Sequence, residues 1–254
     1  MLRTLLAVTA SSLVLCAAST ASAQSLGDKG ELILAADRLV PLFAYDVNKR
    51  DEDAGGNTTR TVTNSQPSFS ILPNVNAAAL GAGNFYNIPR VSLDYAVIQN
   101  LTIGGSVILA FTVGGSNETK QGSTSVSVDA PSQTLFGIAP RVGYTLHLTD
   151  LFTFWPRGGF GFYTFSSKST NTQNNGNTFT STTSLNQFAI NLEPVFAITP
   201  IPHVFFILGP VIDIPITGTI KVEQSANGTT QSTSHDASQF HFGVTAGLGG
   251  YFNL

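Results

Sequence analysis

The chain has 254 residues, of which 42% are hydrophobic and 11% are charged, and its formal net charge is −3. Its twelve lysines and arginines give no cationic excess to neutralise phosphates, which excludes a strongly basic nucleic-acid-binding protein. A single cysteine, Cys16, excludes a disulfide scaffold and a cysteine-based zinc site, and the low charge content is typical of a membrane or secreted β-protein, since about a quarter of residues are charged in soluble domains.

The first 23 residues have the pattern of a cleaved export signal. Arg3 gives a short positive region, the stretch from Leu5 to Ala18 is apolar, and Ala21-Ser22-Ala23 is a small-residue cleavage site. The apolar stretch is too short to span a membrane as a helix. We therefore predict a signal peptide over residues 1–23, a short periplasmic segment over 24–30 and one domain over 31–254.

Strict alternation of apolar and polar residues recurs along the rest of the chain. Phe240, Phe242 and Val244, for example, are separated by His241 and Gly243. Because successive side chains of a strand point to opposite faces, this pattern indicates strands with one apolar and one polar face. In the first strand the parity slips near Asp37, which a β-bulge would permit. The pattern predicts eight strands, over residues 32–45, 91–97, 101–111, 136–146, 152–162, 188–198, 204–220 and 240–254.

The connections between these strands alternate in length. Short turns fall near Asn100, Asp150 and Pro202, whereas long polar connections cover residues 48–87, 114–133, 168–184 and 223–237. Short turns at one end and long loops at the other are typical of outer-membrane barrels. A secreted β-sandwich would also alternate, but its polar faces would carry more charge. We expect an all-β protein: an eight-stranded antiparallel up-and-down transmembrane β-barrel with short periplasmic turns and long extracellular loops.

On this strand pattern the chain resembles the small eight-stranded outer-membrane barrels, the superfamily of the OmpA membrane domain, OmpX and OmpW. The resemblance covers residues 31–254 and rests on topology, with no family-specific motif. Members of the superfamily usually end in an aromatic residue that the barrel-assembly machinery reads. Here Tyr251, Phe252 and Leu254 correspond to that assembly signal in weakened form, because the aromatic residue of the right parity is Phe252 rather than the last residue.

Charged residues gather on the face that the alternation assigns to the barrel lumen. Eight strands leave room for side chains or one small ligand at most, so cations and carboxylates in that space should pair. The predicted lumen charge network consists of Arg90, Asp94, Arg141, Arg157, Glu193 and Asp213, with Asp37 or Arg38 joining it. We expect this network to close the lumen. The alternative is a narrow porin-like channel in which these charges form the constriction.

No enzyme site follows from the sequence. A lipid-modifying barrel enzyme would need a histidine positioned with a serine and an acid. Ser234-His235-Asp236 are adjacent, but neighbours on a strand point to opposite faces, and His241 has no such partners in sequence. His147 and His203 fall at short turns, and the four histidines have no zinc-ligand spacing. We predict no catalytic, cofactor or metal site.

The expected partners follow from the predicted location. They are the lipid and lipopolysaccharide of the bacterial outer membrane and, during biogenesis, the barrel-assembly machinery. An extracellular partner would bind through the long loops. The longest of these, residues 48–87, turns apolar at Phe69 and again from Ala77 to Leu80, which is compatible with a hairpin above the membrane or with a segment folding over or into the barrel mouth.

Overall fold

The computed structural model describes residues 25–55, 58–69, 85–112, 114–121, 124–129, 131–172, 178–226 and 229–253. The expected signal peptide and Leu254 lie outside these ranges. Nearly all of the described chain is β-strand, and the one helical element is a single 3₁₀ turn, η2 (Phe85–Asn87). None of the helical structure within these ranges is long and apolar enough to cross a membrane.

The strands differ strongly in length, from two to 25 residues. In chain order they are β1 (Glu31–Gly55), β2 (Thr58–Phe69), β3 (Arg90–Ile98), β4 (Leu101–Thr112), β5 (Ser116–Gln121), β6 (Thr124–Asp129), β7 (Ser132–Tyr144), β8 (Leu146–His147), β9 (Phe152–Thr172), β10 (Thr178–Ile201), β11 (Val204–Ala226) and β12 (Thr229–Asn253).

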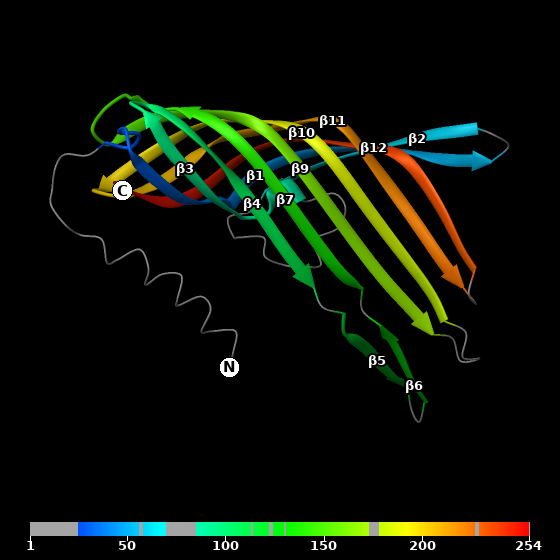
Figure 1. Ribbon diagram of the computed structural model, residues 1–254. Coiled ribbons are helices and arrows are strands. Elements are labelled where there is room, and N and C mark those ends of the chain that lie inside the picture. Colours follow the sequence, from blue (N-terminus) through cyan, green and yellow to red (C-terminus); the bar gives the residue numbers. More distant parts are fainter. Residues whose placement is uncertain are drawn as a thin grey trace.

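The main sheet has ten strands, is antiparallel throughout and closes in a ring (Figure 1). The ring of pairings passes from β1 through β3, β4, β7, β9, β10, β11 and β12 and returns to β1. The sheet therefore contains two strands beyond the eight expected. The additional strands are β2, which pairs with the second half of β1, and the two-residue β8, which pairs with β9.

The expected long polar loops are largely strand, and this corrects the prediction. β9 to β12 run for 21 to 25 residues and extend well beyond β3 and β4 (Figure 1). Residues 116–129 contain the separate hairpin β5–β6. The reason is that serine and threonine also fit a pleated surface, so a polar segment continues the ladder wherever a neighbouring strand offers pairing. β1 and β9–β12 continue past the ends of the shorter strands β3 and β4, and β2 pairs with this outer part of β1. We call these outer parts of β1, β2 and β9–β12 the strand extension.

Side chains alternate between the inside and the outside of the ring, as the sequence pattern requires. On β7, for example, Leu135 and Ala139 are buried, whereas Phe136 and Ile138 are exposed on the outer surface. The first strand interrupts this alternation at a bulge between Ala36 and Val40. The core of the molecule is therefore the lumen, filled by side chains from every strand of the ring.

Residues 25–30 close the end of the ring at which the short turns lie. Leu26, only 2% exposed, joins the buried cluster formed by Trp155, Phe205 and Tyr251. The backbone carbonyl of Leu26 contacts a ring nitrogen of His147 at 3.0 Å. Burial alone would raise the pKa of Asp28 in this segment, but hydrogen bonds from Gln99 and Ser25 outweigh it and lower that pKa below its usual range. The segment is thus fixed against the ring.

Candidate functional site

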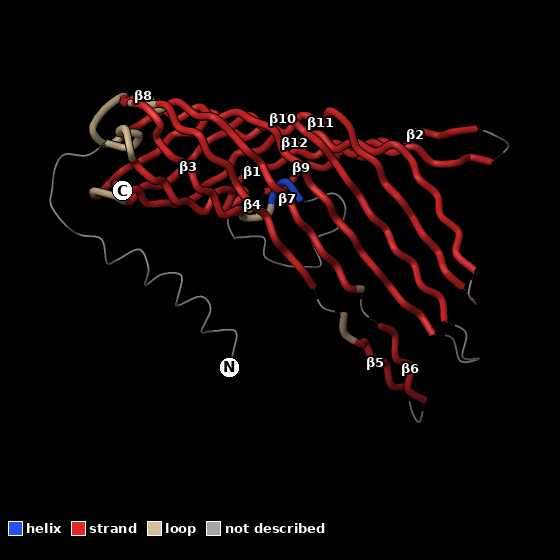
Figure 2. The backbone as a smooth tube through the Cα atoms, viewed as in Figure 1, coloured by secondary structure: helices blue, strands red, loops and turns tan. Residues whose placement is uncertain are grey.

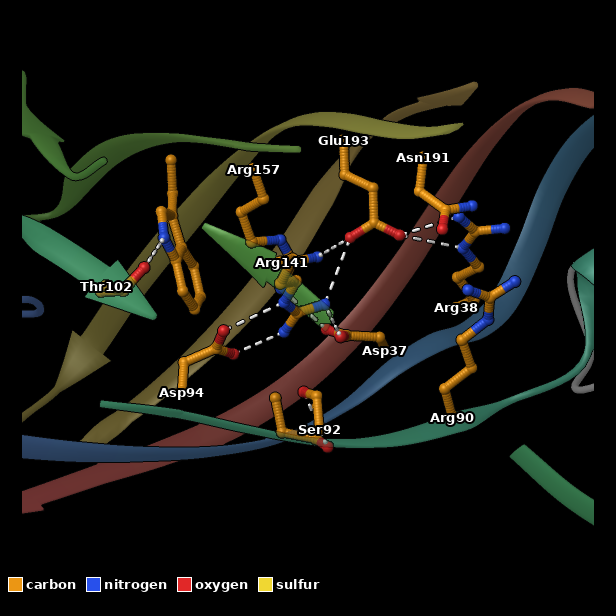
Figure 3. Close-up of polar contacts among 12 residues, drawn as sticks. Asp37, Arg38, Arg90, Ser92, Asp94, Thr102, Arg141, Arg157, Asn191 and Glu193 are labelled. Carbon is orange, nitrogen blue, oxygen red and sulfur yellow. Dashed lines mark hydrogen bonds and ion pairs between the residues drawn. The ribbon is translucent and has the colours of Figure 1, made fainter. Parts of the chain in front are cut away.

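A buried network of charged side chains crosses the middle of the lumen. All six residues predicted for this network face inward, and each is at most 7% exposed. They come from five strands of the ring, which brings side chains far apart in sequence within contact distance (Figure 3). Asp37 and Arg38 of β1 join them, 1% and 2% exposed.

Arg141 on β7 occupies the centre of one half of the network. Its Nε and Nη2 donate to the two carboxylate oxygens of Asp94 at 3.0 and 2.5 Å. Its Nη1 lies 2.5 Å from Asp37 Oδ2 and 3.3 Å from Glu193 Oε2. Arg157 contacts the same two carboxylates, at 3.1 Å for Asp37 and 2.8 Å for Glu193. Two guanidinium groups thus share three carboxylates.

Glu193 connects this half to the other half of the network (Figure 3). Its Oε1 accepts a hydrogen bond from Arg38 Nη2 at 2.8 Å, while its Oε2 faces Arg157 and Arg141. Arg38 in turn donates to both oxygens of Asp213, at 2.6 and 3.0 Å, and Asn191 also donates to Asp213. Charge-assisted, bidentate contacts of this kind are stronger and more directional than neutral hydrogen bonds.

The bulge in β1 explains why both Asp37 and Arg38 reach the lumen. Arg38 has a left-handed φ of 52°, which is uncommon for a residue with a side chain. A bulge inserts a residue that has no ladder partner, so two consecutive side chains point the same way. The parity slip in the sequence marked this position, but it left open which of the two residues faces inward. Both do.

Arg90 behaves differently from the other arginines. The sequence predicts a carboxylate partner for it, whereas its Nη1 donates to the phenol oxygen of Tyr163 at 3.0 Å, and its guanidinium lies over the Tyr163 ring. Its Nε and Nη2 have no hydrogen-bond partner among the described residues. The carboxylates expected to pair with Arg90 are Asp94, Glu193 and Asp213. Among the described side chains, Arg90 forms no hydrogen bond to any of these carboxylates.

A segment between β2 and β3 enters the lumen next to the charge network. Phe85, Tyr86 and Asn87 form the 3₁₀ turn η2 and are all buried (Figure 2). Arg38 Nη1 donates to the carbonyl oxygen of Tyr86 at 3.1 Å. The Tyr86 ring packs at 5.1 Å from Tyr163, measured between ring centroids. We call residues 85–87 the lumen plug. The sequence left open whether the 48–87 connection forms a hairpin or folds into the barrel mouth, and its described parts do both, since β2 pairs with β1 and residues 85–87 are buried in the lumen.

A buried aspartate–histidine pair holds the other side of the lumen plug. His241 Nδ1 lies 2.8 Å from Asp46 Oδ1, in direct register across β1 and β12. The His241 ring stacks on Tyr86 at 5.5 Å, and Asn87 donates to the second oxygen of Asp46 at 3.3 Å. His241 Nε2 has no partner within the described part of the chain. The Asp46–His241 pair thus holds the lumen plug in place. Among the described residues, no serine or threonine hydroxyl is hydrogen-bonded to Asp46 or His241.

An apolar layer fills the lumen between the charge network and residues 25–30. Trp155 is fully buried, donates to Thr102 Oγ1 at 3.1 Å, and lies against the Arg157 guanidinium at 4.7 Å from its ring centroid. A Cβ at Gly143 would stand 2.5 Å from Trp155 Nε1. The inward glycine thus makes the room that the indole ring requires.

The remaining sequence candidates lie outside the charge network. Ser234, His235 and Asp236 lie on β12 in the strand extension, where they pair with β11 rather than occupying a loop. His203 Nδ1 contacts the carbonyl oxygen of Tyr251 at 3.0 Å. In the expected assembly signal, Tyr251 faces inward and is 2% exposed, whereas Phe252 is 37% exposed on the outer surface.

Several residues of the lumen were not identified from the sequence. Asp46, Tyr86, Asn191 and Gln187 all contact the network or the lumen plug. Asp46 lies beyond the bulge, where parity counted from the strand start is misleading. Asn191 and Gln187 share the inward parity of Glu193, so the alternation marked their face, but neutral side chains give no signal of pairing.

No family model matches this chain, and no curated protein sequence matches it. Among solved structures, it is similar to the outer membrane protease OmpT from Escherichia coli, with 8% identity, a TM-score of 0.40, and coverage of 91% of this chain and 100% of that one. It is also similar to Ail, the attachment invasion locus protein of Yersinia pestis, with 10% identity, a TM-score of 0.31, and coverage of 88% of this chain and 99% of that one. The toluene transporter TodX of Pseudomonas putida is similar with 6% identity, a TM-score of 0.23, and coverage of 87% of this chain and 89% of that one. With TM-scores of 0.40 or less, these similarities do not establish the function of this chain.

Proposed function

We propose that this protein is an integral barrel of the bacterial outer membrane whose lumen is closed and whose strand extension faces outward from the cell. The observation that carries the proposal is the inverted distribution of side chains. Ion pairs occupy the buried interior, while large apolar side chains cover the outside of the ring. A soluble protein would have the opposite arrangement, because an extended apolar surface in water favours association.

The outer apolar surface runs around the whole ring. On every strand of the ring at least one large apolar side chain is more than a third exposed. Examples from successive strands are Leu34, Leu93, Leu109, Val142, Phe160, Phe196, Phe206 and Leu248. Between the ends of the ring the outward positions carry no charge in the described strands, which fits a bilayer interior, where a cation would cost about 2–4 kcal/mol at the midplane.

The closed lumen is supported by the buried side chains that fill the ring in the described part of the chain. The cavity beside Arg141, Arg157 and Glu193 measures about 10 Å³, roughly the space that one water molecule needs. The lumen plug fills the layer on one side of the charge network, and the Trp155 layer fills the layer on the other side. We therefore propose that the charge network is structural and that the barrel transports no solute.

A narrow ion-conducting path is the second candidate. Its support is a set of buried polar atoms without partners among the described residues, which includes Arg90 Nη2, Gln187 Oε1 and His241 Nε2. Buried polar groups of this kind are commonly satisfied by ordered water. Water in the lumen would be compatible with slow ion passage if the plug moved.

The proposal includes topology, processing and partners. We propose eight membrane-crossing strands, those of the closed ring, with the turns at Asn100 and Pro202 in the periplasm and export by a signal peptide over residues 1–23. The partners are then outer-membrane lipid and lipopolysaccharide, the barrel-assembly machinery during insertion, and an extracellular ligand at the strand extension. We propose no enzymatic activity.

Fractionation of a Gram-negative host that expresses the full chain tests the location. We expect the protein in the outer-membrane fraction, resistant to urea extraction and migrating differently on detergent gels before and after heating. Recovery from the soluble periplasm would overturn the proposal. Planar-bilayer recording of the refolded protein then separates the two candidates, since a closed barrel shows no steady current and a channel shows a steady, ion-selective one.

A further inference from the structure

A pocket of about 170 Å³ lies on the inner surface of the strand extension, beyond the lumen plug. Its described lining residues lie on the strands β1, β2, β10, β11 and β12. Among the described residues, none of the contacts of the charge network involves the residues that line this pocket, and the proposed function names no ligand class for it.

A row of carboxamide side chains forms one wall of this pocket. Asn64, Asn48 and Gln239 stand in register across β2, β1 and β12. Gln187 approaches from β10, and its Nε2 donates to the carbonyl oxygen of Gln239 at 2.8 Å. The same Nε2 donates to Tyr86 Oη at 2.5 Å, which ties the row to the lumen plug. Gln187 is 2% exposed, and its Oε1 has no hydrogen-bond partner among the described residues.

The other side of the pocket is apolar and uncharged. Leu185 is 5% exposed, and Ile220 and Ala237 pack against the same buried cluster. No carboxylate lines the pocket. Lys49 and Arg50 contribute to its edge, but Arg50 is half exposed and paired with Glu52 at 2.6 Å. The buried part of the lining thus combines neutral donors and acceptors with an apolar surface, and the two cations lie at its exposed edge.

We infer that this pocket binds one neutral sugar ring. Each carboxamide offers two N–H donors and an acceptor oxygen, which matches hydroxyl groups that donate and accept in turn. The C–H face of a sugar ring is apolar and suits a surface such as Leu185 and Ile220. A carboxylate or phosphate ligand is disfavoured in the buried part of the pocket, because its buried lining residues Leu185, Gln187 and Gln239 carry no charge and the cations Lys49 and Arg50 are exposed. The inference extends the proposed surface role, since it names the ligand class.

Calorimetric titration of the refolded full chain in detergent micelles tests this inference. The probes are glucose, galactose, mannose and N-acetylglucosamine, with glucuronate and glucose 6-phosphate as charged counterparts. We expect at least one neutral sugar to bind at one site per chain and its charged counterparts to bind more weakly. Methyl glycosides separate two sources of the ligand: binding of the glycoside indicates the terminal residue of a glycan, and rejection indicates a free reducing sugar.

Two variants connect binding to this pocket. Gln187→Ala removes a carboxamide from the wall and should weaken binding roughly three- to tenfold, the effect of losing one neutral hydrogen bond. Asn186→Ala is the matched control, because Asn186 is the adjacent carboxamide and points to the exposed outer face. Ala237→Phe fills the pocket without touching the contact to Tyr86, and it should abolish binding even if Gln187→Ala folds poorly.

The inference is overturned if no neutral sugar binds, if the charged sugars bind more tightly, or if Asn186→Ala weakens binding as much as Gln187→Ala. These outcomes are distinct from failure of the proposed function. Binding in micelles requires neither outer-membrane location nor a closed lumen, so a negative titration leaves the fractionation and conductance results unaffected.

Discussion

Arg38 and Glu193 meet inside the ring, with Arg38 Nη2 2.8 Å from Glu193 Oε1, although 155 positions separate them in the sequence. The same guanidinium donates to Asp213 and to the carbonyl oxygen of Tyr86. One side chain thus joins β1, β10, β11 and the lumen plug. Arg38 sits on the bulge of β1, so the left-handed conformation at this residue directs its guanidinium to these partners.

Removing Glu193 should destabilise the barrel strongly. Glu193→Ala leaves Arg38, Arg141 and Arg157 short of a carboxylate in a desolvated space, and breaking a buried pair typically costs about 3–5 kcal/mol. The free energy of unfolding can be measured by urea titration in micelles, using the fluorescence of Trp155, the only tryptophan. Glu52→Ala is the control, since Glu52 pairs with Arg50 and Arg60 on the exposed strand extension and should change stability little. Equal effects of the two changes would contradict a structural network.

Shortening Tyr86 should loosen the lumen plug. Its ring packs against Tyr163 and His241, and its hydroxyl accepts a hydrogen bond from Gln187. We expect Tyr86→Ala to raise the single-channel conductance from near zero to a measurable level in planar bilayers. Tyr95→Ala, which removes a tyrosine exposed on the outer face of β3, should leave the conductance at its original level. An unchanged current in Tyr86→Ala would mean that the charge network alone closes the lumen.

Two glycine-to-alanine substitutions should differ in their effect on the free energy of unfolding. A Cβ at Gly143 would stand 2.5 Å from Trp155 Nε1 and 2.7 Å from Thr102 Oγ1, so Gly143→Ala displaces their hydrogen bond. Overpacking of this kind typically costs about 1–3 kcal/mol. At Gly158 the nearest atom would be Leu192 Cδ2 at 3.5 Å, an ordinary contact, so Gly158→Ala should be close to neutral. The same urea titration compares the stabilities of the two variants. If Gly143→Ala were as stable as the original protein, the packing around Trp155 would have room for an additional methyl group.

Cysteine labelling should reveal the orientation. The sequence contains a single cysteine, Cys16, which the expected cleavage after Ala23 removes. New cysteines at Thr61 and Ser225, on the strand extension, should react with an impermeant maleimide in intact cells. Cysteines at Asn100 and Asp150, at the short turns, should react only after the outer membrane is permeabilised. The reverse pattern would invert the proposed topology.

The inward or outward direction of most side chains was readable from the sequence, because that direction is a local property of the strand. Consecutive residues of a strand face opposite sides whatever their partners are. The alternation therefore assigned Arg141, Glu193 and Asp213 to one side of the sheet and the large apolar residues to the other. Even the slip at Asp37 was visible as a break in parity, and the tight turns at Asn100 and Pro202 followed from turn chemistry.

Contacts between distant residues required the tertiary structure. Which carboxylate meets Arg38, and why Arg90 meets Tyr163 instead, depends on the register of strands that closure of the ring brings together. The continuation of β9 to β12 through polar segments depends on neighbouring strands that supply backbone partners. The lumen plug was equally hidden, because the burial of Tyr86 depends on a space that exists only inside the closed ring. Local pattern fixed the faces of the strands, whereas closure fixed the pairs, since pairing depends on distances that no short stretch of sequence contains.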